Sequence, residues 1–308
     1  MMLSGFVSCF ITMVLGLLGV AFFIVTERKG LGMLQLRKGP NKVSFKALGQ
    51  PISDGVKLLS KSWAVPASAN KILFIGAPSL CFIFAYVLWL IFPSLNSSVF
   101  FEYGLLFFVC VSCINVYGVL VVGWSCNSQY GLLGAMRAVA QSISYEVSMS
   151  TLLFCPLIFM GSFSLSALRE SGFSYGLIML EVTLMWLISV LAETNRAPFD
   201  FVEGESELVS GYNVEFGGAG FALIALAEYS NIVFMSLLSG VIFFSGVLDL
   251  YVVGDLVLGV LVFMISFTII WVRGSFPRFR YDKLMMVCWG VFLPLSLVCL
   301  VVCMGAGL

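Results

Sequence analysis

Apolar stretches of about twenty residues recur along the chain, separated by polar segments. Each stretch is long enough to cross a hydrocarbon core of about 30 Å, and open sheet edges cannot face lipid, so each is predicted to be a helix. The predicted spans cover residues 3–25, 71–92, 100–123, 139–160, 173–192, 216–240, 251–272 and 284–303. The pattern therefore predicts an all-α polytopic membrane protein with eight transmembrane helices, forming a single integral membrane domain over residues 1–308.

The polar loop between the first two spans, residues 26–70, contains a second apolar pattern. After the turn signal RKGPN at 37–41, apolar residues recur at three- and four-residue steps, with lysines between them: Phe45, Leu48, Ile52, Val56, Leu59 and Trp63, with Lys46, Lys57 and Lys61. This spacing predicts an amphipathic helix at the membrane interface, broken or kinked at Pro51. A positively charged tether that only fixes topology explains the pattern equally well.

The basic residues are distributed unevenly between the two sides of the predicted bundle. The 1/2 loop holds nine Lys and Arg, the 3/4 and 5/6 loops one each, and the 7/8 loop four, which leaves only Arg169 in a loop of the opposite side. The positive-inside rule therefore places the odd-numbered loops in the cytoplasm or its organellar equivalent. One missed or additional helix would have scrambled this asymmetry.

Composition narrows the function classes. The chain is 60% hydrophobic and 10% charged, with a mean hydropathy of +1.07, which is outside the range of soluble globular proteins. Its formal net charge is zero, so no basic surplus suggests nucleic acid, and it has no histidine, the commonest metal ligand. Of nine cysteines only Cys110 and Cys113 form a C-x-x-C, without a second pair, so we expect no metal site and interpret the cysteines as small buried apolar residues.

Two carboxylates lie inside predicted spans. Glu146 is in the fourth span and Glu228 in the sixth. A charged carboxylate at such a depth costs at least ~2.5 kcal/mol on insertion scales, so it is expected to face a partner or water, and both are candidate proton relays. The alternative is interhelical hydrogen bonding that only holds the bundle together. A polar stripe also follows one face of the fourth span, and for its Ser and Thr residues this alternative is the preferred interpretation: Arg137, Gln141, Ser144, Ser148 and Thr151.

The segment 192–216 concentrates acids around a single cation, Arg196. Its acids are Glu193, Asp200, Glu203, Glu205, Glu207 and Glu215. Like charges this close disfavour simultaneous ionisation unless basic groups approach, and the nine cations of the 1/2 loop are predicted to lie on the same side. The acids alternate with apolar residues, which favours a loop folded onto the bundle over a solvated acidic loop.

Five long motifs carry a resemblance to a known family. They are ERKGLGMLQLRKGPN (27–41), GWSCNSQYGLLGAMRAVAQSISYEVS (123–148), AETNRAPFDFVEGESELVSGYNVEF (192–216), FALIALAEYSNI (221–232) and RGSFPRFRYDKLM (273–285). In order and over nearly the whole chain, these motifs resemble the family of membrane-arm subunit 1 of respiratory complex I, the proton-translocating NADH:ubiquinone oxidoreductase, and its mitochondrially encoded members most.

The resemblance implies a role for three loops, 26–70, 193–215 and 273–283, and for two sets of residues. One set would line or support the tunnel through which ubiquinone reaches its electron donor: Glu27, Arg28, Arg37, Asp54, Phe221 and Arg273. The other would form an acidic path that couples quinone reduction to proton pumping: Glu146, Glu193, Asp200, Glu203, Glu205, Glu207, Glu215 and Glu228.

The resemblance also implies the setting of the chain. It would bind no cofactor itself, with ubiquinone as substrate and with FMN and iron–sulfur clusters in partner subunits. Its partners would be quinone-module peripheral subunits, antiporter-like membrane subunits and membrane lipids. It would lie in the mitochondrial inner membrane, with the odd-numbered loops on the matrix side.

Some positions depart from the family pattern, and other functions remain conceivable. Ser62 removes an acid that often follows Lys61, Ala225 replaces an aromatic residue, and Glu181, inside the fifth span, has no counterpart. A stand-alone cation/proton antiporter would use the same buried carboxylates, but the sequence shows no internal repeat. An assembly scaffold, whose acids only pair with neighbours, is the third alternative.

Overall fold

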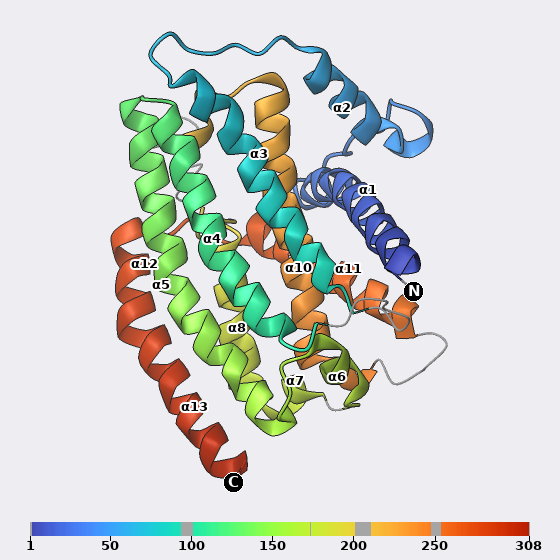
Figure 1. Cartoon of the computed structure of the whole chain (residues 1–308), viewed down its shortest axis with the longest axis vertical. Coiled ribbons are helices and arrows are strands. Elements are labelled where there is room, and N and C mark those ends of the chain that lie inside the picture. The colour runs from blue at the N-terminus through green and yellow to red at the C-terminus, as the bar shows by residue number, and fades with distance from the viewer. Residues whose placement is uncertain (1, 94–100, 173, 201–210, 248–253, 308) are drawn as a thin grey trace.

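The computed structural model describes residues 2–93, 101–172, 174–200, 211–247 and 254–307, and within these ranges the regular structure is helical. Figure 1 shows most of the long helices standing side by side as a bundle. Seven helical segments of the described residues are long and apolar enough to cross a membrane. They are α1 (Met2–Leu34), α3 (Lys71–Val87) with the turn Leu88–Ile91, α4 (Gly104–Ser125), α5 (Gln129–Met160), α10 (Gly218–Phe243), α11 (Gly254–Ser275), and α12 (Tyr281–Val287), which continues through Cys288–Phe292 into α13 (Leu293–Gly307).

The predicted fifth span, 173–192, is divided in the structure. A short helix α7 (Tyr175–Ile178) is separated from α8 (Leu180–Glu193) at Met179, whose backbone leaves the helical region at φ −118° and ψ 66°. The 14 residues of α8 extend about 21 Å, which is less than a hydrocarbon core of about 30 Å. The all-helical membrane fold is therefore confirmed, whereas an eighth transmembrane helix stays a prediction.

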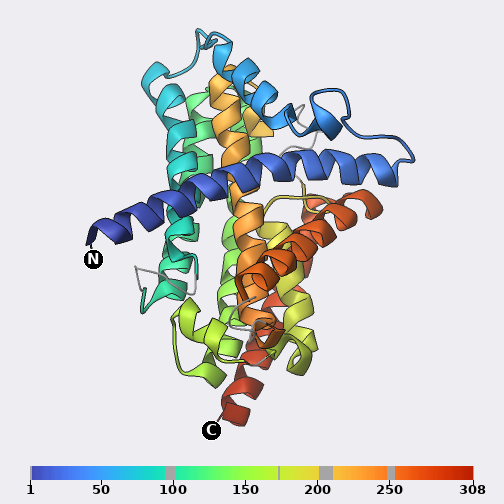
Figure 2. The same ribbon diagram turned by 90° about the vertical axis from the view of Figure 1, so that its right-hand side faces the viewer.

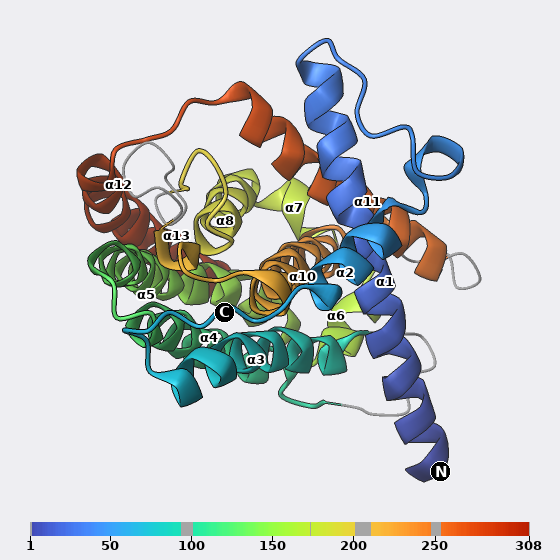
Figure 3. The same cartoon turned by 90° about the horizontal axis from the view of Figure 1, so that it is seen from above.

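Helix α1 lies at a steep angle to the rest of the bundle. Figure 2 shows it crossing the vertical helices, and Figure 3 shows it running along one side of the molecule. Its 33 residues extend about 50 Å, and a helix longer than the hydrocarbon core accommodates its length by tilting. Its second half packs on α11, where a Cβ added to Gly30 would lie 3.1 Å from Ile270 Cγ2, so the absence of a side chain at position 30 permits this approach.

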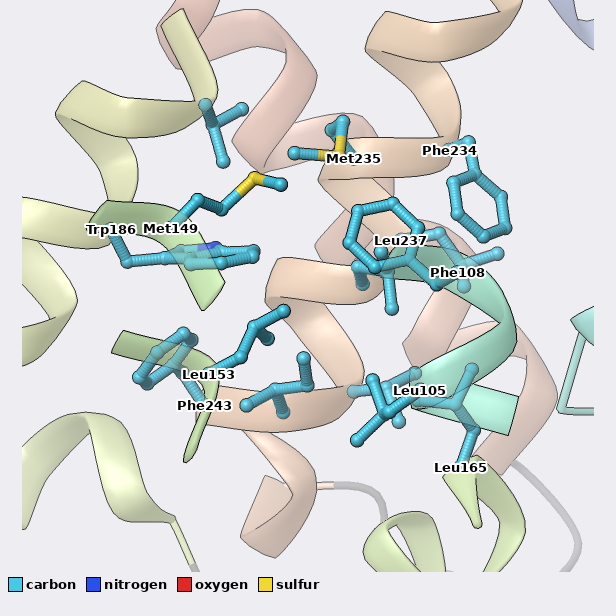
Figure 4. Close-up of a cluster of buried hydrophobic side chains, with 14 of the residues drawn as sticks. Leu105, Phe108, Met149, Leu153, Leu165, Trp186, Phe234, Met235, Leu237 and Phe243 are labelled. Atoms are coloured by element: carbon cyan, nitrogen blue, oxygen red, sulfur yellow. The ribbon is translucent and has the colours of Figure 1, made fainter. Parts of the chain in front are cut away.

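The largest hydrophobic core lies where α4, α5, α8 and α10 meet (Figure 4). Trp186 of α8 is fully buried, and its indole Nε1 donates a hydrogen bond of 2.8 Å to Ser239 Oγ of α10. The side chains around it come from three other helices: Leu105 and Phe108 of α4, Met149 and Leu153 of α5, and Phe234, Met235, Leu237 and Phe243 of α10. This core fixes α8 against its neighbours.

The 1/2 loop contains a helix where one was predicted. Helix α2 (Gln50–Ser60) has Pro51 in its first turn, where a missing N–H costs nothing, so Pro51 begins the helix and does not kink it. The preceding residues Phe45–Ala47 form a separate 3₁₀ turn. One face of α2 is apolar and open to the surroundings, with Ile52, Val56 and Leu59 each more than 60% exposed. Its position at the membrane interface stays a prediction.

The cysteines divide into three groups, of which one, Cys9 and Cys299, is partly buried. Cys81, Cys126, Cys155, Cys288 and Cys303 are buried, as predicted. The prediction of burial was wrong for Cys110 and Cys113, which are exposed on the outer face of α4 because no other described element of the chain covers that face. The remaining helix, α6 (Leu165–Glu170), and the 3₁₀ turns Gly211–Asn213 and Ser245–Val247 lie in connections.

Candidate functional site

Glu27 of α1 forms the centre of a cluster of charged and aromatic side chains. The residue is 4% exposed, and its Oε1 accepts from Arg196 Nη1 at 3.4 Å and from Arg273 Nη1 of α11. The Arg196 guanidinium also lies 4.4 Å from the centroid of the Tyr229 ring of α10. These four residues, the Glu27 cluster, tie α1, α10, α11 and the segment after α8 together.

Pairing is required for a carboxylate at this depth. An ion buried without a partner is strongly destabilising, and a guanidinium forms hydrogen bonds to a carboxylate in a fixed planar geometry. The structure brings the predicted tunnel residues Glu27 and Arg273 together. It also pairs Arg196, the lone cation of the acidic segment, with Glu27.

The other predicted tunnel residues lie closer to the surface. Arg28 Nη1 pairs with Asp54 Oδ2 at 3.0 Å, which links α1 to α2. Arg37 is exposed and its Nε donates to Gln35 Oε1 at 2.8 Å. Phe221, in the first turn of α10, is 40% exposed. Four of the six predicted tunnel residues are thus in contact in two pairs, Glu27 with Arg273 and Arg28 with Asp54.

Glu193 and Glu228 line one small internal cavity of about 50 Å³. Both carboxylates face it together with the amides of Asn115 and Asn231. The hydroxyl of Tyr212 donates a hydrogen bond to Glu228 Oε1 from the wall of the same cavity. A water needs roughly 10–15 Å³ of such volume and polar partners, so this cavity has room for a short chain of waters.

A second cavity of about 30 Å³ continues from the first. It shares Asn115, Glu193, Thr194 and Asn231 with the first cavity, and it is also lined by Ser112 of α4. Ser112 Oγ in turn donates to Glu146 Oε1 of α5 at 2.9 Å. Glu228, Glu193 and Glu146 therefore form a row, the carboxylate row, in which each member is connected to the next by polar groups around a cavity.

Several buried oxygens along these cavities have no protein partner within the described residues. They are Glu193 Oε2, Asn195 Oδ1 and Asn231 Oδ1. Buried polar atoms are nearly always hydrogen-bonded, to protein or to ordered water. Polar walls, unsatisfied acceptors and sufficient volume together make both cavities suited to hold water, which conducts protons between carboxylates.

The acids that follow α8 have different surroundings. Asp200 is buried and pairs with Arg278 of the 7/8 loop at 3.6 Å. Glu215 is partly buried near Cys126; burial, with a smaller contribution from the Glu215 charge, raises the pKa of the Cys126 thiol to about 11. Glu203, Glu205 and Glu207 lie outside the described residues.

The polar stripe of α5 holds elements together. Gln141 is fully buried, and its Nε2 donates to the carbonyl oxygens of Ala192 at 2.9 Å and Phe199 at 3.0 Å, on either side of the segment that begins with Glu193. Thr151 Oγ1 donates to Ser296 Oγ of α13 at 2.8 Å. The interhelical hydrogen bond predicted for the Ser and Thr residues is thus present at Thr151, while Gln141 joins α5 to the end of α8 and to the segment after it.

Sequence reasoning missed several residues around the carboxylate row. Asn115 and Asn231 are single amides within apolar spans, and that isolation is a signal by which they could have been found. Tyr212 and Thr194 carried no signal, because they lie in a polar segment and reach Glu228 and the cavities only through tertiary folding.

Comparison with known proteins gives one consistent match. The family model described as NADH dehydrogenase matches residues 7–304. The chain is 48% identical over 295 residues to a protein of Heterololigo bleekeri (95% of this chain, 93% of the relative), and 45% identical over 295 residues to one of Mytilus edulis (94% of each). It is also 48% identical over 283 residues to one of Aedes aegypti (91% and 89%). All three relatives are named NADH-ubiquinone oxidoreductase chain 1.

Proposed function

The chain belongs to the NADH dehydrogenase family, and from that premise we propose that it is a core membrane subunit of proton-translocating NADH:ubiquinone oxidoreductase. The proposal is supported by matches over more than nine-tenths of the chain to relatives that carry this enzyme's name. The same matches give no support to a stand-alone antiporter. Its place would be the mitochondrial inner membrane, with the odd-numbered loops in the matrix, beside quinone-module and antiporter-like subunits.

At the quinone end, the Glu27 cluster would support the inner wall of the ubiquinone tunnel, and Arg28, Arg37, Asp54 and Phe221 would lie nearer its mouth. Ubiquinone is the substrate, while FMN and the iron–sulfur clusters belong to partner subunits. The chain's own contribution is positioning: ion pairs fix α1 against α11, and the resulting wall presents guanidinium groups able to donate hydrogen bonds to quinone oxygens.

At the coupling end, the carboxylate row would carry protons between the quinone site and the pumping subunits. The observation that carries this proposal is the shared lining of the two cavities by Asn115, Glu193, Thr194 and Asn231, which connects Glu228 on one side with Ser112 and Glu146 on the other. Among the described residues, Glu193 is the only carboxylate that faces both of these cavities, so a proton moving along the row would pass through it. Asp200, Glu203, Glu205, Glu207 and Glu215 would extend the row toward the matrix loops.

Replacing Glu193 with Gln in the assembled enzyme tests this role. The amide keeps the shape of the side chain and removes the exchangeable carboxyl proton, so we expect most quinone-linked proton pumping to be lost while NADH oxidation by artificial acceptors continues. Glu170→Gln is the matched control, since Glu170 is exposed at the end of α6 and should leave pumping unchanged.

Two other outcomes are informative. Normal pumping by an assembled Glu193→Gln enzyme would overturn the proton path. Reduced abundance of the complex with normal turnover per assembled enzyme would instead favour the scaffold interpretation.

A further inference from the structure

A large groove lies at the other end of α8 from the carboxylate row. It has a volume of about 550 Å³ and is formed by the end of α5, the break between α7 and α8, and the last turns of α13. Glu181, which lines it, is twelve residues from Glu193, or about 18 Å along the helix. Figure 1 shows these elements together at the lower end of the bundle, near the C-terminus.

The groove has the shape expected for one lipid chain. Val298, Val302 and Ala306 line it at four-residue steps along one face of α13, a length of about 12 Å. One leaflet contributes about half of a 30 Å hydrocarbon core, or roughly 15 Å, so the groove has the length of an acyl chain within one leaflet. Val298 and Val302 are about 60% exposed, so the groove opens along its length to the surroundings of the bundle.

A single carboxylate interrupts the apolar lining. Glu181 is exposed in the first turn of α8, and among the described residues no Lys or Arg forms an ion pair with it. A carboxylate beside an apolar groove attracts a cationic group that can donate hydrogen bonds to it. Glu181 shares the groove with Cys299 of α13.

We propose that this groove binds a phospholipid with a primary ammonium headgroup, its acyl chain lying along α13 and its ammonium group pairing with Glu181. The apolar walls select a hydrocarbon chain, and the carboxylate selects a cation that can donate hydrogen bonds. A transmembrane helix of a partner subunit fits less well. Such a helix is about 10–12 Å wide with its side chains and packs along an extended face, whereas this cavity is hollowed beside a helix break.

The test uses the delipidated complex reconstituted into bilayer discs with a photoactivatable lipid. One sample contains phosphatidylethanolamine with a diazirine on its acyl chain, and the other contains phosphatidylglycerol with the same chain. Cross-links to the α13 peptide that holds Val298–Ala306 are counted by mass spectrometry. The internal control is the outward face of α11, where Leu256 and Val260 are exposed and the adjacent carboxylate, Asp255, is already paired with Arg169.

We expect phosphatidylethanolamine to label the α13 peptide about fivefold more than phosphatidylglycerol does. This ratio corresponds to an exposed ion pair of about 1 kcal/mol. Both lipids should label α11 equally. Glu181→Gln should remove the difference at α13 without lowering assembly, because the side chain is exposed. Equal labelling of α13 by the two lipids in the unmodified complex would overturn the assignment of the headgroup. Absence of labelling at α13 would show that a partner subunit covers the groove, and would overturn the proposal as a whole.

Discussion

Replacing Glu27 with Gln should destabilise the quinone end of the subunit, because this carboxylate holds two guanidiniums. Its side chain is 6% exposed, and those of Arg196 and Arg273 are 9% and 28% exposed. Gln preserves the volume and one acceptor oxygen but removes the negative charge. The two arginines are then left close together without the group that neutralises them.

The expected magnitude follows from burial. Breaking a buried ion pair by removing one partner costs about 3–5 kcal/mol, and the lower end applies here because Arg273 keeps some access to solvent. About 3 kcal/mol corresponds to a shift of roughly 100-fold in the equilibrium between the closed cluster and an opened one. The change should appear as loss of quinone-linked activity before the rest of the complex comes apart.

The assay follows the solubilised complex at a fixed elevated temperature. At each time the quinone reductase activity is divided by the activity with an artificial acceptor, and the half-life of this ratio is measured. Asp282→Asn is the matched control, since Asp282 and its partner Arg280 are 65% and 77% exposed and such pairs contribute at most about 1 kcal/mol. The double variant with Arg273→Gln should recover part of the loss, because it removes one of the uncompensated charges. A half-life for Glu27→Gln equal to that of the control, or strictly additive effects in the double variant, would refute the reasoning.

Three further substitutions have expected outcomes. Gly134→Ala places a Cβ 2.8 Å from the Tyr212 backbone nitrogen, which must shift Tyr212 from Glu228, so quinone-linked pumping should fall more than artificial-acceptor activity. Gln141→Leu removes two hydrogen bonds that hold the segment around Glu193, at roughly 1 kcal/mol each, and should increase proteolytic cleavage after α8 in the isolated complex. Ser239→Ala leaves the buried Trp186 N–H without its acceptor, which costs about 1–3 kcal/mol and should lower the thermal midpoint of the subunit while the pumping stoichiometry stays unchanged.

The pattern of apolar residues predicted most of the fold. Long spans such as 100–123 and 216–240 appear as α4 and α10 with small shifts at their ends, because twenty apolar residues in a bilayer have few alternatives to a helix. The break at Met179 could not be predicted, since Met179 and its direct neighbours Ile178 and Leu180 are ordinary helix-forming residues and the nearest glycine, Gly176, lies inside α7. Packing of Trp186 into the core determines where α8 lies, and that information is tertiary.

The ionisable residues of the candidate site could be predicted from the sequence. The cavities and contacts that connect these residues could not. Glu146 and Glu228 were identifiable because carboxylates are rare in spans, but nothing in the sequence indicates that Glu193 separates two cavities. The partner of Arg196 could not be predicted either. It is Glu27, 169 positions away in sequence, and only the crossing of α1 over the bundle brings them within 3.4 Å.

The shortness of α8 bears on how the protein enters its membrane during synthesis. The insertion machinery sorts nascent segments by their hydrophobicity. Helix α8 has only 14 residues, with Glu181 in its first turn and Glu193 at its end. It is therefore too short, and too polar at its ends, to partition into lipid alone. Trp186 and Ser189 become fully buried only against neighbouring helices. Helix α8 therefore attains its place cooperatively with α5 and α10, and the orientation of the chain after residue 193 depends on helices that are synthesised later.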